Sequence, residues 1–225
     1  MDKVEALKIA YKNIVSDYKE FSGEDFNMNW DQQANINVEI WNGMTQEQQD
    51  RFYELNPKYV YDALAFYDHI PVKIHPLYKV LSRFPGAKIL DFGCGTCCDL
   101  LALRLMGLDI DGVDNGGYHV EFGKWRLEKY KVPTKISKQI DGHYDIIYCY
   151  DVLEHLRTLS PTVDEICRSC DMLIACWEFT DINDTFPIHF VHKDKDVFDL
   201  IESYGFERDY GLMMPRLPRV WRKKK

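Results

Sequence analysis

The 225-residue chain lacks long apolar runs, and none approaches the roughly 20 residues that a helix needs to cross a bilayer. The first five residues also lack the basic stretch and apolar block of a secretory signal. A net charge of −8 disfavours broad binding to nucleic acid or to an anionic membrane. We therefore expect a soluble, cytoplasmic protein without a membrane partner; the sequence indicates no oligomeric state.

The seven cysteines lack a regular framework, and their odd number fits a reducing compartment. Two C-x-x-C pairs occur, Cys94/Cys97 in a predicted turn and Cys167/Cys170 on a predicted helix. The pairs are much further apart than the two pairs of a zinc ribbon. We interpret these cysteines as small buried side chains rather than as a structural zinc site.

A βαβ unit is the most informative feature of the chain. An apolar run over residues 87–90 predicts a buried parallel strand, which ends in Asp91 and a turn containing Gly93 and Gly95. After a helix, a second strand ends at Asp114. In such units an acid at the tip of the second strand holds a ribose.

The turn lacks the third glycine of a dinucleotide-binding turn, because Cys98 stands at that position. Asp91 would repel a pyrophosphate and attract an ammonium group. S-adenosylmethionine has no phosphate, but it has an ammonium, a carboxylate, a sulfonium and an adenosine. Asp91 suits the ammonium, the free N–H groups near Thr96 suit the carboxylate, and Asp114 suits the ribose hydroxyls.

Three motifs occur in order: Asp91-Phe-Gly-Cys-Gly95, Gly112-Val-Asp114, and the stretch from Tyr144 to Leu156. Together they resemble the motifs of class I S-adenosylmethionine-dependent methyltransferases, from about residue 80 to the C-terminus. The resemblance implies an α/β, doubly wound, mostly parallel seven-stranded sheet with an antiparallel edge strand. Residues 81–225 would form this Rossmann-like domain, and residues 1–80 an N-terminal helical extension or lid.

Helices are predicted in the extension over residues 3–20, from the T-x-x-Q capping box at Thr45 towards Leu55, and over residues 57–69 and 77–84. Residues 22–44 show only weak periodicity. In the family such extensions often close over the cofactor, and the candidates for this lid are Tyr61, Phe66, Tyr67 and His69. The alternative is that these aromatic side chains only pack the extension onto the sheet.

The motifs predict the cofactor-binding residues Asp91, Gly93, Cys94, Gly95, Asp114, Asn115, Tyr150 and Asp151. Many family members hold the adenine amine with an acid after the third strand. Here only Asp141 is available, displaced by a few residues, so the contact to the adenine amine is not predicted.

After the fourth predicted strand, Asp151, Glu154 and His155 form D-x-x-E-H, and we predict Glu154 and His155 as catalytic. The spacing is similar to the E-x-x-E-H of ubiquinone-pathway O-methyltransferases and of small-RNA 3′-terminal 2′-O-methyltransferases, where it can hold a divalent cation. The resemblance implies the metal ligands Asp151, Glu154, His155 and His189. However, V-L-E-H is also widespread in class I enzymes that use no metal, where the acid and the histidine cap a helix or hold a loop.

The predicted function is S-adenosylmethionine-dependent methylation of a small molecule, at an oxygen. The strand end lacks the [DNS]-P-P-[YF] motif of adenine and cytosine N-methyltransferases. Methylation of RNA or protein is the second hypothesis, because residues 216–225 carry six basic side chains. A non-catalytic S-adenosylmethionine-binding module is the third, since a fold does not dictate activity.

Overall fold

The computed structural model describes residues 1–26, 30–69, 74–177, 188–212 and 219–224, without the side chains of residues 30, 31, 66–69 and 74–76. Its sheet has the strand order β3-β2-β1-β4-β5-β7-β6. The strands are β1 (Ile89–Phe92), β2 (Ile110–Val113), β3 (Ile136–Ser137), β4 (Tyr144–Tyr150), β5 (Cys170–Cys176), β6 (Phe206–Arg208) and β7 (Arg219–Lys223).

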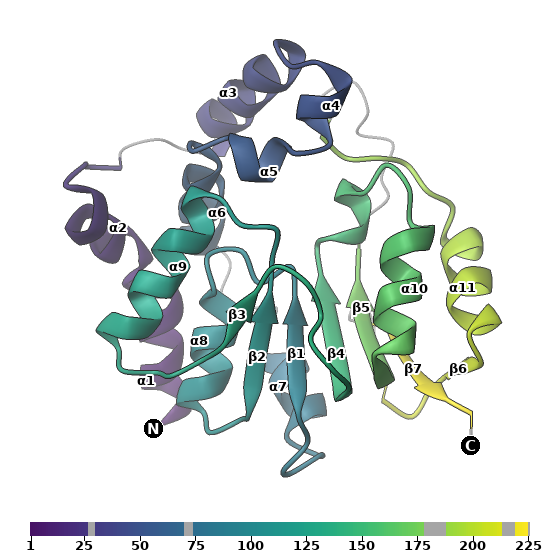
Figure 1. The fold of residues 1–225 in the computed structure, drawn as a ribbon. Helices are drawn as coiled ribbons and strands as arrows, with labels where there is room; N and C mark the ends of the chain where they lie inside the picture. Colours follow the sequence, from purple (N-terminus) through teal and green to yellow (C-terminus); the bar gives the residue numbers. More distant parts are fainter. Residues whose placement is uncertain (27–29, 70–73, 178–187, 213–218, 225) are drawn as a thin grey trace.

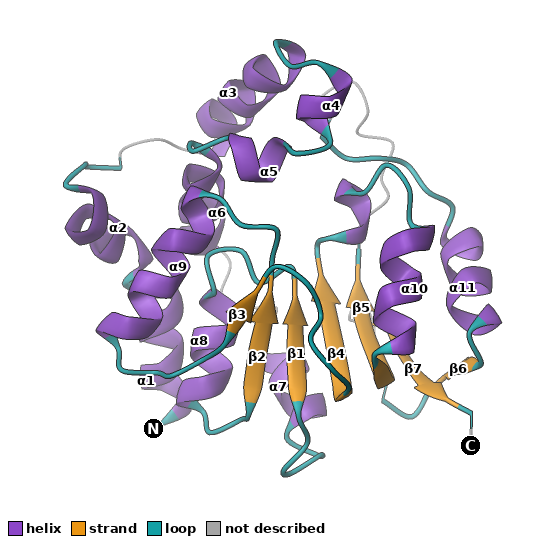
Figure 2. Ribbon diagram, in the orientation of Figure 1, coloured by secondary structure: helices purple, strands orange, loops and turns teal. Residues whose placement is uncertain are grey.

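The predicted seven-stranded, mostly parallel sheet is confirmed. Strands β1 to β5 pair in parallel, and β7 pairs antiparallel with both β5 and β6. The antiparallel strand therefore lies beside the edge strand β6 rather than at the edge itself (Figure 2). Strand β3 is short, since only residues 136 and 137 pair with β2.

Successive side chains of a strand point to opposite faces of the sheet, so neighbouring residues of β1 belong to two separate hydrophobic clusters, one on each face. Ile89 joins the cluster of α8 (Cys98–Leu105) and α9 (Tyr118–Lys129). Leu90 joins the cluster of α10 (Ser160–Arg168) and α11 (Asp194–Ser203). These layers make the doubly wound arrangement of Figure 1.

The extension consists of short helices: α1 (Lys3–Leu7), the π-helix η1 (Lys8–Lys12), α2 (Ile14–Ser22), α3 (Trp30–Asn42), α4 (Gln46–Gln49), α5 (Phe52–Leu55), α6 (Tyr59–His69) and α7 (Ile74–Leu81). Helices α3, α4 and α5 lie beyond the carboxyl ends of the parallel strands (Figure 1). The predicted capping box is confirmed, with Thr45 and Gln48 bonding to each other's backbone N–H. Helix α3 was missed because residues 22–44 have only weak periodicity.

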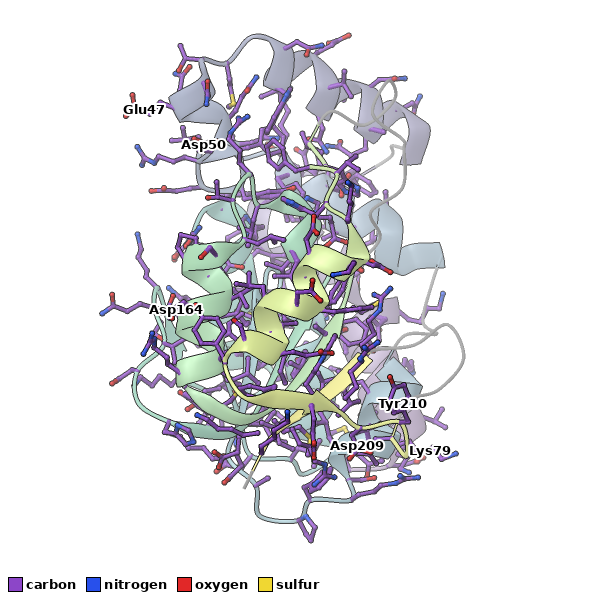
Figure 3. The ribbon with its side chains drawn as sticks, turned by 90° about the vertical axis from the view of Figure 1, so that its right-hand side faces the viewer. Glu47, Asp50, Lys79, Asp164, Asp209 and Tyr210 are labelled. Atoms are coloured by element: carbon purple, nitrogen blue, oxygen red, sulfur yellow. The ribbon has the colours of Figure 1, made fainter. Side chains whose placement is uncertain are left out.

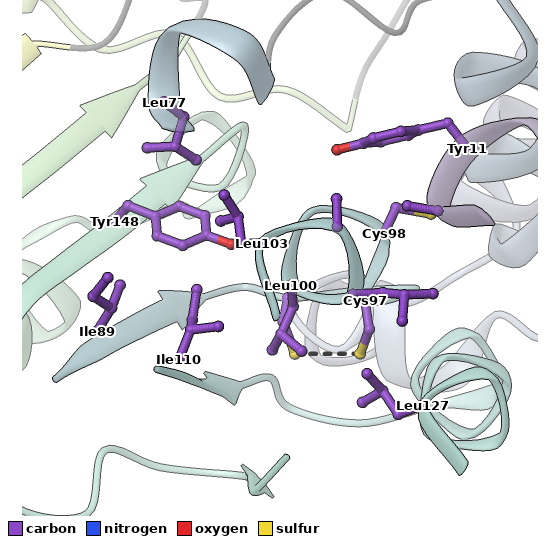
Figure 4. Packing of buried hydrophobic residues seen from close by; sticks show 14 of the residues in the cluster. Tyr11, Leu77, Ile89, Cys97, Cys98, Leu100, Leu103, Ile110, Leu127 and Tyr148 are labelled. Carbon is purple, nitrogen blue, oxygen red and sulfur yellow. Dashed lines mark hydrogen bonds between the residues drawn. The ribbon is translucent and has the colours of Figure 1, made fainter. Parts of the chain in front are cut away.

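The extension and the sheet share one hydrophobic cluster, which includes Tyr11 of η1, Leu77 of α7 and Tyr148 of β4. Figure 4 shows Tyr11 beside Cys98 of α8, and Leu77 above the Tyr148 ring. Residues before position 81 are therefore packed into the same core as the sheet. A domain boundary at residue 80 stays a prediction.

A buried arginine also links the extension to α9. Arg126 is fully buried, its Nε donates to Asp17 Oδ2 at 2.9 Å, and its Nη2 donates to the carbonyls of Ile9 and Ala10. The π-helix thus presents two carbonyl oxygens to one guanidinium. Such a buried charge is stable only when it is paired and hydrogen-bonded.

Among the described residues, no helix is both long enough and apolar enough to cross a membrane. None of the seven cysteines, all within the described parts of the chain, forms a disulfide, and the four in the C-x-x-C pairs are buried, as predicted. Figure 3 shows Glu47 and Asp50 at the end of the molecule formed by the extension, far from Asp209 and Tyr210.

Candidate active site

The turn after β1 needs glycine at position 93. Gly93 has a φ of 81°, and a Cβ built there would lie 2.3 Å from Val152 Cγ2. The N–H groups of Gly93 and Cys94 both donate to the carbonyl of Val113, at 2.8 and 3.1 Å. The turn is thereby fastened to the end of β2, next to Asp114.

Asp91 lies at the end of β1 and is only 4% exposed. Burial raises the pKa of its carboxyl well above the usual value, and the nearby carboxylates of Asp99 and Asp114 raise it further. The nearby Tyr148 side chain partly opposes this shift of the pKa. A cation placed beside Asp91 would relieve the cost of ionising it.

Asp114 follows β2 and accepts hydrogen bonds from the N–H groups of Gly95 (3.0 Å) and Gly116 (3.1 Å). Its Oδ1 is 3.6 Å from His119 Nε2. Burial alone would raise the pKa of Asp114, but the His119 side chain and the two amides lower it below its ordinary value. Asp114 is therefore held as an ionised acceptor. The next predicted residue, Asn115, is exposed.

A pocket of about 290 Å³ opens beside Asp114. It is lined by Glu54, Asp114, Gly116, Gly117, Val120, Glu121, Lys124, Ile136, Ser137 and Lys138. The lining comes from the ends of β2 and β3, from α9 and, through Glu54, from α5 of the extension. This place suits a nucleoside whose sugar lies against Asp114. Asp141 is not among the lining residues; it pairs with Lys135 at 2.5 Å.

At the end of β4 the chain turns sharply. Asp151 has a φ of 51°, and its N–H donates to the carbonyl of Cys176 at 3.0 Å. This left-handed residue directs the chain into the 3-10 helix η2 (Leu153–His155). The buried hydroxyl of Tyr150 has no hydrogen-bond partner within the described parts of the chain. A hydroxyl left in this state is a candidate contact for a ligand.

Glu154 and His155 lie on η2, under the extension. Glu154 is 1% exposed, and its carbonyl accepts from the N–H of Phe190 at 2.6 Å. Nδ1 of His155 is hydrogen-bonded to the hydroxyl of Tyr53 and lies 3.4 Å from the carbonyl of Ile188. Burial, and secondarily His189, lower the pKa of His155 to about 3, so its imidazole is neutral at physiological pH.

Tyr53, Tyr59 and His119 belong to the site, although the sequence did not mark them. Ring centroids are 5.2 Å apart for His119 and Tyr59, 4.5 Å for Tyr59 and Tyr53, and 4.9 Å for Tyr53 and His155. These rings form a continuous path from Asp114 to His155 across the carboxyl end of the sheet. Tyr53 and Tyr59 have no local motif, and only their position in the folded extension reveals them.

Of the predicted lid residues, only Tyr61 has a described side chain. Its hydroxyl donates to Glu24 at 2.8 Å, and its ring packs edge-on against Tyr18 at 5.6 Å. Both of these contacts lie within the extension, and a role of Tyr61 in a lid stays a prediction. The side chains of Phe66, Tyr67 and His69 lie outside the described residues.

The four predicted metal ligands are not gathered into a ligand set in the described structure. No group of three or more His, Cys, Asp and Glu side chains among those described is arranged to hold a metal ion. The His155 and His189 rings meet edge to face, with centroids 4.6 Å apart. Nε2 of His192 donates to the carbonyl of Leu156 at 2.8 Å, which gives this histidine a role in holding the loop.

The fold and the glycine turn define a Rossmann-like α/β domain of the class I methyltransferase type. Residues 67–174 match a family model described as a methyltransferase domain. Over 112 residues the chain is 26% identical to a ubiquinone biosynthesis O-methyltransferase from Proteus mirabilis, which covers 46% of this chain and 44% of that protein. The enzyme of the same name from Bordetella avium is 24% identical, over 46% of this chain and 45% of that protein.

Solved structures show the same fold. Magnesium protoporphyrin IX methyltransferase from Synechocystis PCC 6803, with bound S-adenosylmethionine, superposes with a TM-score of 0.56 at 16% identity, covering 100% of this chain and 98% of that chain. TehB from Haemophilus influenzae gives a TM-score of 0.55 at 17% identity, covering 72% of this chain and 66% of that chain. The chain spans less than half the length of the curated relatives above, so their substrates do not transfer to it directly.

Proposed function

We propose that this protein transfers a methyl group from S-adenosylmethionine to a hydroxyl group of a small molecule. One observation carries the proposal: Asp91 and Asp114 end two adjacent strands, on either side of a turn that Gly95 ties to Asp114 at 3.0 Å. The pocket beside Asp114 lies at the same edge of the sheet. Ligands of open α/β sheets bind at this edge.

The side chains fit the cofactor. A buried carboxyl with a raised pKa, Asp91, suits an ammonium group that would share its burial. Each Asp114 oxygen accepts one backbone amide, which leaves acceptor sites for two ribose hydroxyls. When bound, S-adenosylmethionine supplies a methyl group on a positively charged sulfur. Alignment of that methyl group with its acceptor is the protein's main contribution to the rate, up to about 7–11 kcal/mol.

His155 and Glu154 are the groups proposed to meet the acceptor. As the acceptor oxygen bonds the methyl carbon, the S–CH₃ bond breaks, its electrons stay on sulfur, and the hydroxyl proton must leave. The neutral imidazole of His155, held by Tyr53, is the proposed first acceptor of that proton, which then passes to water. Since the predicted metal ligands form no set among the described residues, no step is assigned to a cation.

The relatives from Proteus mirabilis and Bordetella avium are O-methyltransferases by name, which supports oxygen as the accepting atom. The free cysteines agree with the reducing, cytoplasmic location predicted from the sequence. RNA methylation receives less support, because two arginines of β7 are already paired: Arg219 with Asp194 at 2.7 Å, and Arg222 with Asp209 at 2.5 Å. A small molecule remains the proposed acceptor.

The test is to incubate the protein with methyl-labelled S-adenosylmethionine and a panel of phenols, catechols and aliphatic alcohols. Labelled ether and an equal amount of S-adenosylhomocysteine are expected, with little of either from His155→Gln. Adding EDTA tests the cation prediction, since unchanged rates would remove it. Tight cofactor binding without turnover on any acceptor would instead favour the non-catalytic module, and turnover on RNA alone the second hypothesis.

A further inference from the structure

Helix α5 of the extension packs against the loop that follows β2. A Cβ built at Gly117 would lie 2.7 Å from the carbonyl oxygen of Tyr53 and 3.2 Å from Cα of Glu54. Gly117 also has a φ of 120°, a conformation that glycine adopts without steric cost. This close approach brings the Glu54 side chain to the pocket of about 290 Å³ beside Asp114, which it helps to line.

If this pocket holds adenine, the exocyclic amine of the base needs a hydrogen-bond acceptor. Asp141, the first acid after β3 in the chain, pairs with Lys135 at 2.5 Å and is not among the described residues that line the pocket. The Ser137 hydroxyl donates to the carbonyl of Gln139 at 2.9 Å, and the Ser137 carbonyl accepts from the N–H of Asp114 at 3.0 Å. The end of β3 is therefore a poor source of this acceptor.

The described lining of the pocket contains three acids, Glu54, Asp114 and Glu121. Asp114 is the residue that we assign to the ribose hydroxyls. Glu121 accepts from Lys124 at 3.3 Å on the surface of α9, and 63% of its side chain is exposed. The Glu54 side chain is 32% exposed, so it is better shielded from water than Glu121. Glu54 is thus the acid best placed to receive the base.

Arg51 orients the carboxylate of Glu54 and keeps it ionised. The Nε and Nη2 atoms of Arg51 each donate to one Glu54 oxygen at 2.9 Å. These hydrogen bonds lower the pKa of Glu54, and the charge of Lys138 lowers it further. A carboxylate has about four lone-pair sites, so a bidentate arginine leaves room for a ligand N–H.

A donor lies near this acceptor. Lys138 also lines the pocket, and its Nζ lies 3.7 Å from the place that a Cβ of Gly116 would take. Glu54 and Lys138 are within electrostatic range of each other. The pocket therefore presents a carboxylate acceptor and an ammonium donor on the side away from the ribose-binding acid.

We propose that Glu54 accepts a hydrogen bond from the exocyclic amine of adenine, and that the extension thereby selects an adenosyl cofactor. The inference rests on the proposed function, because it concerns the cofactor of the same site. The Watson–Crick edge of adenine carries this donor beside a ring nitrogen that accepts, to which Lys138 can donate. Hypoxanthine has a carbonyl oxygen in place of the amine and an N–H at the ring nitrogen, so it would meet both side chains with the wrong polarity.

The test measures the dissociation constants of S-adenosylhomocysteine and S-inosylhomocysteine by isothermal titration calorimetry. The two ligands carry the same charge and differ only in the base. Wild type should bind the inosyl compound at least about tenfold more weakly, because a site built to bind an N–H rejects an analogue that lacks it. Glu54→Gln should reduce this ratio to about threefold or less, since an amide both donates and accepts.

Glu121→Gln is the matched control, because it removes the same charge from the same pocket and should leave the ratio unchanged. Glu54→Asp is the second variant if Glu54→Gln does not fold. Its shorter side chain should weaken the adenosyl ligand several-fold and hardly change the binding of the inosyl ligand. Equal affinity of wild type for the two ligands, a ratio that survives in the folded Glu54 variant, or an equal fall of the ratio in the Glu121 control would overturn the inference.

These titrations separate the inference from the proposed function, because neither ligand has a methyl group to donate. A protein that prefers the adenosyl ligand through Glu54 but methylates no hydroxyl compound would support the inference and contradict the proposed O-methylation. A protein that methylates hydroxyl compounds but binds both ligands equally would do the reverse. Binding of neither ligand at millimolar concentration would contradict both.

Discussion

The hydroxyl of Tyr53 is hydrogen-bonded to Nδ1 of His155, although 102 positions separate the two residues in the chain. The contact joins α5 of the extension to η2 at the end of β4. It fixes the orientation of the imidazole that we propose to meet the acceptor. The extension thus contributes directly to the candidate active site and does more than cover it.

Replacing Tyr53 with phenylalanine should lower kcat about tenfold, because the ring contacts stay while the hydrogen bond that orients His155 is lost. The dissociation constant of S-adenosylmethionine should hardly change. Tyr61→Phe is the matched control, since its hydroxyl donates to Glu24 away from this site. Equal losses of kcat in both variants would show that the Tyr53 hydroxyl has no special role.

His155 should not titrate between pH 8 and pH 5, because burial lowers its pKa to about 3. The ring-proton shift of His155 in the NMR spectrum, assigned with His155→Gln, should therefore stay constant over this range. If His155 titrated near pH 6.5, the kcat of the wild type would fall below that pH and the kcat of His155→Gln would not. We expect no such fall in the wild type. A shift that moves with a midpoint near 6.5 would contradict the burial of this imidazole.

Asp62 should make the protein less stable as the pH rises. Burial raises its folded pKa from 3.8 to about 7, so its contribution is complete below pH 3.8 and is lost as the pH rises through about 7. Asp62→Asn keeps the oxygen that accepts from Asn37. The free energy of unfolding of the variant, relative to wild type, should increase by up to about 3 kcal/mol between pH 5 and pH 8.

Urea unfolding of both proteins at several pH values provides this measurement. Parallel stability curves would mean that Asp62 ionises as easily in the folded as in the unfolded state. The pKa values of Asp91 and His155 are also shifted, so these residues affect the pH dependence of stability in both proteins. Only the difference between the variant and wild type isolates Asp62.

Breaking the Arg126–Asp17 pair should destabilise the protein by about 3–5 kcal/mol. Asp17 would keep only the partly exposed Lys129 as a cationic partner, and the carbonyls of Ile9 and Ala10 would lose their donor. Arg126→Met tests this by urea unfolding. Lys129→Met also removes a cation from Asp17, but that side chain is partly exposed, and a loss of about 1 kcal/mol or less is expected. A loss for Arg126→Met no larger than for Lys129→Met would show that the buried pair does not hold the extension.

Gly93→Ala should cost more than Gly86→Ala, although both glycines have a φ of 81°. A Cβ at position 86 meets nothing within 4 Å, whereas one at position 93 would lie 2.3 Å from Val152 Cγ2. Gly86→Ala measures backbone strain alone, about 1–2 kcal/mol, whereas Gly93→Ala adds a clash beside the cofactor turn. Only Gly93→Ala should also weaken S-adenosylmethionine binding.

The sequence predicted the βαβ unit well because its signals are local. The apolar run of β1, the glycines with positive φ and the acid after β2 each have a short-range cause. The capping box at Thr45 was visible for the same reason. The residues proposed to bind the cofactor could therefore be named before the fold was known, and their role stays a prediction.

Glu154 and His155 could be named from the D-x-x-E-H spacing, but the tyrosines beside them could not, because these residues meet only through tertiary packing. Tyr53 and Tyr59 reach His155 and His119 from helices whose sequences carry no motif. The lowered pKa of His155 likewise arises from burial by distant segments. Helix α3 was missed since its weak amphipathic pattern reflects a buried polar network, in which Gln33 and Asn56 both donate to Asn37.

Isothermal titration calorimetry with S-adenosylmethionine, on wild-type protein and Asp114→Asn, tests the central claim most directly. The account predicts a dissociation constant in the micromolar range for wild type, weakened at least about tenfold by the loss of one charged acceptor. Circular dichroism would establish that the variant is folded. A folded wild-type protein that gives no heat and no competition with S-adenosylhomocysteine, or an Asn variant that binds equally well, would contradict it.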